Sequence, residues 1–272
     1  MKKIFKLLTL VFVILIFTNC TNSLKKVTGV FKSETSYNNI TATFVTTQGE
    51  ISFYLYPEAA PITVANFINL AKRGFYDNTK FTRAVENFVI QGGDPTGTGY
   101  GGPGYTIPDE IVNWLDFYQQ GMLAMANAGP NTGGSQFFFT YYPAEWLNGV
   151  HTIFGEVKSE ADFTKVKKLE LGDVIKEIKF SKNADLFLSL NKYYIEDWNR
   201  VLDANFPNLK NYPIKDASTE EELAYKEELE RIYTRKINDK KQNSFEYPTT
   251  KAIRGIFNKI GNYTPRESVI SE

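Results

Sequence analysis

Reactive side chains are scarce in this chain. Its 272 residues include one cysteine, Cys20, and one histidine, His151. A single cysteine cannot form a disulfide within the chain, so disulfides do not stabilise the fold. Metal sites in proteins usually combine several histidine, cysteine or carboxylate ligands. With one histidine and no thiol beyond Cys20, we expect no metal site, and we expect no cofactor.

An excess of charge of either sign is also lacking. The 31 lysines and arginines balance the 31 aspartates and glutamates. A nucleic-acid-binding protein needs a basic face, so we expect no nucleic-acid partner. Apolar residues make up 42% of the chain, which is typical of a globular protein rather than a disordered one.

The one glycine-rich motif has no helix after it. Residues 97–102 match the pattern G-x-G-x-x-G. A dinucleotide site requires a strand before such a motif, a helix directly after it and an acidic residue ~20 positions on. Here Pro103 and Gly104 follow instead. We therefore expect no nucleotide partner and interpret the glycines as a tight loop.

The apolar run near the N-terminus is too short for a membrane-spanning helix. Residues 7–17 are almost all apolar, whereas a span must cross ~30 Å of hydrocarbon. Three lysines precede the run, and this order is typical of a secretory signal. We expect residues 1–20 to be a lipoprotein-type signal peptide. Residues 21–39, rich in Thr, Asn, Ser and Lys, are predicted to be a flexible tether.

Cys20 directly follows the apolar run. Residues 17–20 resemble a bacterial lipobox, although Phe17 and Asn19 stand where Leu and Gly or Ala are usual. Two or more acyl chains on this cysteine provide stable anchoring, at ~0.8 kcal/mol per buried CH₂. We expect lipidation of Cys20, a membrane partner reached through that lipid, and a periplasm-facing place in a bacterial cell envelope. Thr21 favours the outer membrane. The alternative is an unmodified thiol beside an ordinary cleavage site.

The middle of the chain has mainly β character. Residues 41–47 and 50–56 alternate between apolar and polar positions, which predicts two strands. Residues 61–74 begin with proline and end with Lys-Arg-Gly, the punctuation of a helix. Residues 75–180 consist of short β-like runs between Gly, Pro and Asn. This pattern indicates a closed antiparallel barrel and leaves the strand number open.

Helical periodicity replaces the β pattern after residue 180. A first helical stripe consists of Leu186, Leu190, Tyr194, Trp198 and Val201. A second helix is predicted from Ser218, with Glu221 completing a capping box. Its apolar stripe consists of Tyr225, Leu229, Ile232, Tyr233 and Ile237. Residues 251–260 are a candidate third helix. The extension 181–272 can pack on the barrel, dimerise or dock a partner, and packing on the barrel is favoured.

Three segments within the β-rich region carry a family resemblance. They are residues 81–94, with the sequence FTRAVENFVIQGGD, residues 125–140 and residues 146–155. The chain thereby resembles the cyclophilins, which are peptidyl-prolyl cis-trans isomerases. The resemblance implies that residues 40–180 form a closed eight-stranded antiparallel barrel capped by two helices. It also places residues 97–102 near a peptide groove.

The resemblance implies roles for particular residues. Arg83 matches the arginine that binds the proline carbonyl and approaches its nitrogen in the twisted state. Gln91 matches the glutamine that holds this arginine. The other catalytic positions are Phe88, Phe138 and His151. The substrate-binding positions are Val89, where methionine is common, and Ala126, Asn127, Ala128, Gln136, Trp146 and Leu147. In this scheme His151 is a pocket wall rather than a base, so we expect weak pH dependence from it.

The implied reaction needs no nucleophile and no metal. The X–Pro bond rotates over a barrier of ~20 kcal/mol, which arises from amide resonance. A guanidinium that draws the nitrogen lone pair out of conjugation lowers this barrier. We therefore expect a lipid-anchored isomerase that acts on proline-containing polypeptides and assists their folding. The alternative is a non-catalytic peptide-binding or chaperone module that recruits partners through its helical tail.

Overall fold

The computed structural model describes residues 40–242. The predicted signal peptide 1–20 with Cys20, the tether 21–39 and the helix 251–260 lie outside the described residues. Within residues 40–242, no helix is both long and apolar enough to cross a membrane. The strands are β1 (Thr41–Thr46), β2 (Gly49–Leu55), β3 (Thr79–Lys80), β4 (Arg83–Val85), β5 (Val89–Gly92), β6 (Met122–Met125), β7 (Phe137–Thr140), β8 (Ile153–Val157) and β9 (Val174–Phe180). The helices are α2 (Pro61–Lys72), the 3-10 turn η1 (Glu145–Leu147), α3 (Glu160–Val166), α4 (Asn183–Leu190), α5 (Lys192–Asn205) and α6 (Thr219–Gln242).

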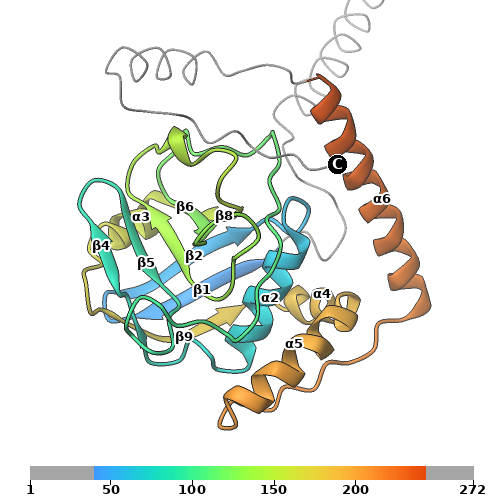
Figure 1. The fold of residues 1–272 in the computed structure, drawn as a ribbon, viewed down its shortest axis with the longest axis horizontal. Helices are drawn as coiled ribbons and strands as arrows, with labels where there is room; N and C mark the ends of the chain where they lie inside the picture. The colour runs from blue at the N-terminus through green and yellow to red at the C-terminus, as the bar shows by residue number, and fades with distance from the viewer. Residues whose placement is uncertain (1–39, 243–272) are drawn as a thin grey trace, which may run out of the picture. The chain divides into compact units, whose positions relative to one another are not determined.

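The described strands form one curved antiparallel sheet in the order β3-β9-β1-β2-β8-β6-β7-β5-β4 (Figure 1). The mainly β sheet is as predicted, but a closed eight-stranded barrel is not shown, because the ladder of the described strands has nine members and two ends. The reason lies in the extended segment 79–85. Its first part, β3, pairs with β9, and its second part, β4, pairs with β5. One segment of chain therefore supplies both ends of the sheet.

Aromatic rings fill the space between the sheet and helix α2. Phe44 of β1 lies edge-on to Phe53 of β2, with ring centroids 5.3 Å apart, and Phe53 stacks on Phe139 of β7 at 4.5 Å. Phe67 of α2 lies 5.2 Å from Phe154 of β8. All five side chains are fully buried. Alternation along each strand puts these rings on one face, as the sequence pattern predicted.

Helix α2 is buried on more than one face. The residues buried without interruption are Thr63, Val64, Ala65, Asn66, Phe67, Ile68, Asn69, Leu70 and Ala71. A helix packed on a single sheet would bury only one stripe. Here α4 and α5 pack against α2 as well, while α2 also contacts β9. The helical extension thus covers the side of α2 that an isolated barrel would leave in water.

The N-terminus of α2 takes its cap from a distant carboxylate. Ala60 precedes the helix and offers no side-chain hydrogen bond. Instead, Glu110 Oε2 accepts hydrogen bonds from the Thr63 backbone N–H at 2.8 Å and from its hydroxyl at 2.9 Å. A carboxylate at this end satisfies otherwise unpaired N–H groups and complements the helix dipole. The loop that carries Glu110 is thereby fixed to α2.

The favoured arrangement of the tail, packing on the barrel domain, is confirmed for its described part. Lys72 at the end of α2 pairs with Asp185 of α4 at 2.7 Å. Arg73 pairs through Nη2 with Asp203 of α5 at 2.5 Å and donates from Nε to the Lys210 carbonyl at 3.2 Å. These contacts join the last turn of α2 to three parts of the extension.

The helices of the extension differ in detail from the predicted stripes. The first stripe spans two helices, α4 and α5, which meet at Asn191. Because the chain turns there, Tyr194 is 45% exposed, whereas Ile195, Trp198 and Leu202 are buried. The capping box before α6 is confirmed. The Ser218 backbone N–H donates to Glu221 Oε2 at 2.8 Å, and the Glu221 N–H donates to Ser218 Oγ at 3.3 Å.

Helix α6 covers a buried carboxyl group on the barrel domain. The pKa of Glu58 is raised to about 7, mainly by burial, and the nearby carboxylate of Glu228 on α6 contributes to this rise. Glu58 Oε2 is buried without a hydrogen-bond partner among the described residues. Arg235 of α6, which lies over the Trp114 ring at 4.1 Å, partly offsets the rise. The two buried acids therefore favour a neutral Glu58.

A glutamine at position 58 should make α6 packing less sensitive to pH. The folded pKa of Glu58 exceeds its ordinary value of 4.5, so its stabilising protonated form is lost as pH rises toward 7. We expect Glu58→Gln to match the wild type near pH 4.5 and to exceed its unfolding free energy by up to about 3 kcal/mol above pH 7. Urea unfolding from pH 4.5 to 8 measures this. Glu227→Gln, an exposed neighbour on α6, is the control, and a pH-independent difference for Glu58→Gln would contradict the assignment.

Candidate active site

Two neighbouring strands bring Arg83 and Gln91 together. Arg83 of β4 lies directly opposite Gln91 of β5 in the antiparallel register. Its Nη1 donates to Gln91 Oε1 at 3.4 Å, which is a long and therefore weak hydrogen bond. The Arg83 side chain is exposed. The glutamine thus orients the guanidinium while most of its N–H groups face solvent.

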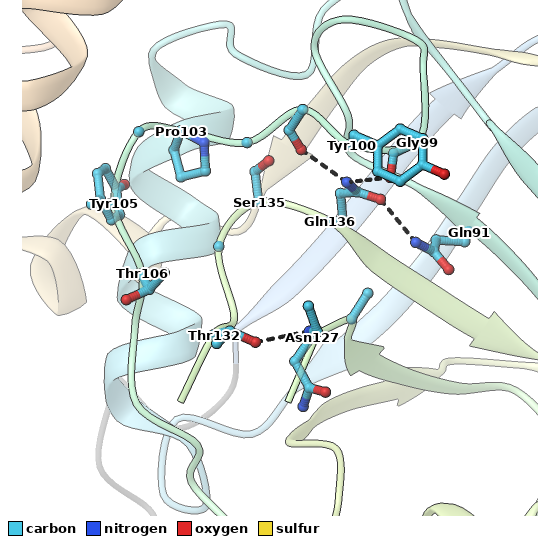
Figure 2. A pocket seen from close by; sticks show the side chains of 16 residues that line it. Gln91, Gly99, Tyr100, Pro103, Tyr105, Thr106, Asn127, Thr132, Ser135 and Gln136 are labelled. Atoms are coloured by element: carbon cyan, nitrogen blue, oxygen red, sulfur yellow. Dashed lines mark hydrogen bonds between the residues drawn. The ribbon is translucent and has the colours of Figure 1, made fainter. Parts of the chain in front are cut away.

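A chain of amide hydrogen bonds extends from Gln91 into the neighbouring loop. Gln91 Nε2 donates to Gln136 Oε1 at 2.8 Å (Figure 2). Gln136 Nε2 in turn donates to the carbonyl oxygens of Gly99 and Gly101, at 3.1 and 2.8 Å. Each amide both accepts and donates, so both side chains have a fixed orientation. The glycine-rich loop is thereby tied to the arginine.

A cluster of apolar side chains lies beside this chain of hydrogen bonds. Phe138 of β7 is opposite Gln91 in the register and is nearly buried. The His151 ring stands perpendicular to the Phe138 ring, with centroids 5.2 Å apart. The Phe117 ring stacks on the Phe138 ring, with centroids 6.1 Å apart. Val89 belongs to the same buried cluster. The partly buried residues packed against it are Tyr56, Phe88, Leu115, Ala126 and Leu147.

Trp146 lies against Phe88 at the edge of this apolar cluster. It lies in the 3-10 turn η1, and its ring is 5.4 Å from that of Phe88. The tryptophan is 62% exposed, so this contact covers only part of its surface. An exposed aromatic ring beside a half-buried one provides an apolar surface for a ligand at little ordering cost.

His151 is held in its neutral form. Its Nδ1 lies 3.0 Å from the Met125 carbonyl oxygen. A carbonyl can only accept, so Nδ1 carries the proton in this contact. Burial lowers the pKa of His151, although the bond to Met125 works in the opposite direction. The ring is therefore uncharged near pH 7 and presents its edge to Phe138.

The segment after β6 presents free backbone groups. The Ala126 N–H donates to the Gln136 carbonyl at 2.9 Å, and the Ala128 N–H donates to Thr132 Oγ1 at 2.8 Å. Asn127 lies between them, and its side chain donates to the Val150 carbonyl at 2.8 Å. Its own backbone N–H and carbonyl form no hydrogen bond with any described residue. An extended peptide can pair with such groups as an added strand.

A groove of about 540 Å³ continues from Asn127 and Gln136 along the glycine-rich loop (Figure 2). Its lining residues are Gln91, Gly99, Tyr100, Gly101, Gly102, Pro103, Gly104, Tyr105, Thr106, Ala126, Asn127, Ala128, Thr132, Gly134, Ser135 and Gln136. The glycine loop lies beside the binding residues, as predicted. No lining residue carries a charge.

The structure brings the predicted residues of the barrel domain into one continuous surface, and the roles assigned to them stay predictions. Sequence reasoning missed the groove wall at Pro103 and Tyr105 and the anchoring groups Met125 and Thr132. Phe117 was also missed, since the residues around it show no period. The glycine run was the one signal that pointed to the groove.

The arrangement can bind a peptide and polarise one of its amide groups, but it offers no activated nucleophile. Arg83 has exposed N–H donors, Phe138 belongs to an apolar cluster, and the backbone groups of Asn127 are free of hydrogen bonds to the described residues. No group of three metal-ligating side chains occurs among residues 40–242. Such a surface fits a reaction in which a bound peptide changes conformation and no proton or group is transferred.

Comparison with known proteins covers the sheet and the start of the extension. The family model for cyclophilin type peptidyl-prolyl cis-trans isomerase/CLD matches residues 41–186. Peptidyl-prolyl cis-trans isomerase B of Bacillus subtilis is 54% identical over 130 residues, 48% of this chain and 90% of that protein. The peptidyl-prolyl cis-trans isomerase of Helicobacter pylori is 42% identical over 142 residues, 52% of this chain and 87% of that protein. A crystal structure of a Cryptosporidium parvum cyclophilin type isomerase has a TM-score of 0.50 and 36% identity, covering 53% of this chain and 98% of that one.

The protonation state of His151 can be measured directly. It is the only histidine in the chain, so its imidazole carbon-bound protons give the only histidine signals in an NMR titration of untagged protein. We expect a midpoint below the ordinary value of 6.5, because burial disfavours the charged ring. A midpoint above 6.5 would mean that a nearby acid, not burial, dominates at this site.

Proposed function

The chain belongs to the cyclophilin-type peptidyl-prolyl cis-trans isomerases, and we propose that it rotates X–Pro bonds in polypeptides of a bacterial cell envelope and so assists their folding. The observation that carries the catalytic part of this proposal is the placement of Arg83. Its guanidinium is exposed and oriented by Gln91, and Gln91 separates it from Phe138 in the same cross-strand row, two strands away. A proline ring in an apolar pocket at Phe138 would lie beside the donor.

The pocket suits a proline ring because the ring has nothing polar to satisfy. Proline lacks a backbone N–H, so apolar walls impose no desolvation cost on it. Phe138, the neutral ring of His151 and the partly buried Phe88 provide such walls. Val89, where methionine is common in the family, is shorter and stiffer, which leaves the pocket apolar.

Arg83 would act on the twisted bond. In the planar amide the nitrogen lone pair is delocalised into the carbonyl, and rotation removes that delocalisation. A guanidinium N–H can then donate to the localised lone pair, an interaction absent from the planar ground state. Stabilisation of the twisted state alone is what raises the rate. No bond is made or broken, so the reaction needs no general base.

The backbone at Asn127 would align the substrate. Its free N–H and carbonyl can pair with the residue that precedes proline, in the manner of an added strand. Main-chain pairing makes few demands on side-chain identity, which suits an enzyme that acts on many unfolded chains. The uncharged groove beyond Ala128 and Thr132 would then receive residues further toward the N-terminus of the substrate.

A continuous ring of backbone pairing would hold these parts rigidly. We propose that residues 79–85, which contain β3 and β4, form one bent strand, and that this strand closes the sheet into a barrel. The Phe81 N–H donates to the Asp173 carbonyl, and the Thr82 N–H donates to the Gln91 carbonyl, both at 2.9 Å. Consecutive residues thus bond to opposite ends of the strand order, which supports closure by a single bent strand.

The envelope location is the part of the proposal that depends on the N-terminus. Its support is the order of lysines, apolar run and Cys20 in the sequence. Acylation of Cys20 and a tether of residues 21–39 would hold the isomerase at a membrane surface facing the periplasm, with the outer membrane favoured. The enzyme would then meet exported chains while they are still unfolded.

Loss of the guanidinium should abolish most of the activity. We expect Arg83→Ala, in the full chain in detergent, to lower kcat/KM for an X–Pro peptide by roughly 10- to 100-fold, because it removes a charged donor from the twisted state. Lys80→Ala changes an exposed cation on the same extended segment and should leave the rate unchanged. Wild-type protein that binds the peptide without accelerating its isomerisation would point to the binding-module alternative.

Anchoring can be tested separately from catalysis. We expect the full chain to fractionate with membranes and to incorporate labelled fatty acid, and Cys20→Ser to lose both properties because no other cysteine is present. The isomerase rate in a detergent extract is the control and should be equal for the two proteins. Membrane association of Cys20→Ser without label would overturn the lipid anchor.

A further inference from the structure

One wall of the groove receives little support from the sheet. Residues 102–106 form no backbone–backbone hydrogen bond within the described part of the chain. The bonds that fix this segment lie at its two ends. Gln136 holds the Gly101 carbonyl before it, and the Ile107 N–H donates to the Gly133 carbonyl after it. The middle of the wall must therefore be held by side chains.

Helix α5 provides much of that support. The Trp198 ring lies parallel to the Tyr105 ring, with centroids 5.8 Å apart and an interplanar angle of 8°. Trp198 is buried, and its own helix is joined to α2 through the hydrogen bond from Asn69 to Asn199 at 2.9 Å. Tyr105 completes the link, since its hydroxyl donates to Asn66 of α2 at 2.7 Å.

Gly104 shows how closely α5 approaches the wall. A Cβ at this position would lie 2.5 Å from Asn205 Nδ2 and 3.2 Å from Val201 Cγ1, both on α5. The backbone at Gly104 also has φ +89°, a conformation that favours glycine. The loop therefore packs closely against α5 at two adjacent residues, Gly104 and Tyr105.

We propose that α5 holds this wall in place, so that Trp198 is a positioning residue that sets how tightly the groove binds uncharged substrate side chains N-terminal to proline. The groove lining has no charge, and backbone carbonyls of Gly99 and Gly101 lie at its end. An acidic side chain would find no cation there and would lose its hydration. The helical extension thereby contributes to substrate selection. This inference rests on the proposed isomerase function.

The experiment compares peptides that differ only at the residue predicted to enter the groove. Phenylalanine, glycine and glutamate are placed two residues before proline, and kcat and KM are measured with the full chain in detergent. We expect Trp198→Ala to raise KM for the phenylalanine peptide by roughly 3- to 10-fold, the size of a lost aromatic stack. The glycine peptide should change less than about 2-fold. Glutamate should be the poorest substrate of the wild type.

Matched variants separate positioning from general damage. Tyr193→Ala alters an aromatic residue of the same helix that is 77% exposed and should leave all three peptides unchanged. Trp198→Phe keeps an aromatic ring and should restore most of the selectivity. If Trp198→Ala fails to fold, the double variant Val201→Ala with Asn205→Ala loosens the same wall at Gly104 and should show the same selective rise in KM.

The outcomes distinguish this inference from the proposed function. In Trp198→Ala, an equal rise in KM for the phenylalanine and glycine peptides would overturn the role of α5 even if the enzyme is active. An unchanged KM for the phenylalanine peptide would overturn it as well. If the wild-type protein accelerates the isomerisation of none of the peptides, the proposed isomerase function is wrong instead. Calorimetric binding of the same peptides then decides the inference alone. The inference about α5 is supported if the wild type binds the phenylalanine peptide more tightly than the glycine peptide and Trp198→Ala loses this difference.

Discussion

Burial of α2 on both of its sides is the constraint on which the rest of the structure depends. The sheet covers one side and α4 with α5 cover the other, so the polar residues Asn66 and Asn69 lie in the interior. Buried amides must find partners. Asn66 donates to the Gly134 carbonyl and accepts from Tyr105. Asn69 donates to Asn199, while its Oδ1 has no hydrogen-bond partner among the described residues. One helix therefore joins the core, the groove and the extension.

The site is assembled by register more than by individual contacts. Arg83 faces Gln91 across one strand pair, and Gln91 faces Phe138 across the next. A donor, an orienting amide and an apolar wall thus occupy successive strands at a spacing fixed by the sheet. A slip of one residue would turn all three to the other face. The chemistry needs few side chains because the sheet positions them.

The sequence predicted those elements whose formation depends on residues close together in the chain. The strands at 41–47 and 50–56, the helix from residue 61 and the capping box at Ser218 all follow from alternation or punctuation within a few residues. The site residues were placed by family resemblance, since an isolated Arg83 or Gln136 has no pattern of its own. The bend at Phe81 and Thr82 was not predictable, because two partners far apart in sequence determine it. Packing of the extension on the barrel domain was predicted, but its position over α2 was not, because a helical stripe does not specify the surface that it contacts.

The position of β9 affects how the protein can fold as it is made. Although last of the strands in sequence, β9 lies between β1 and β3 in the sheet. Until it emerges from the ribosome, both neighbours are open edges with unpaired backbone groups, the kind that other chains can add to. Contacts between residues so distant in sequence also form slowly. The segment that carries Arg83 acquires its second pairing partner only at this stage, so this edge is among the last parts of the sheet to form.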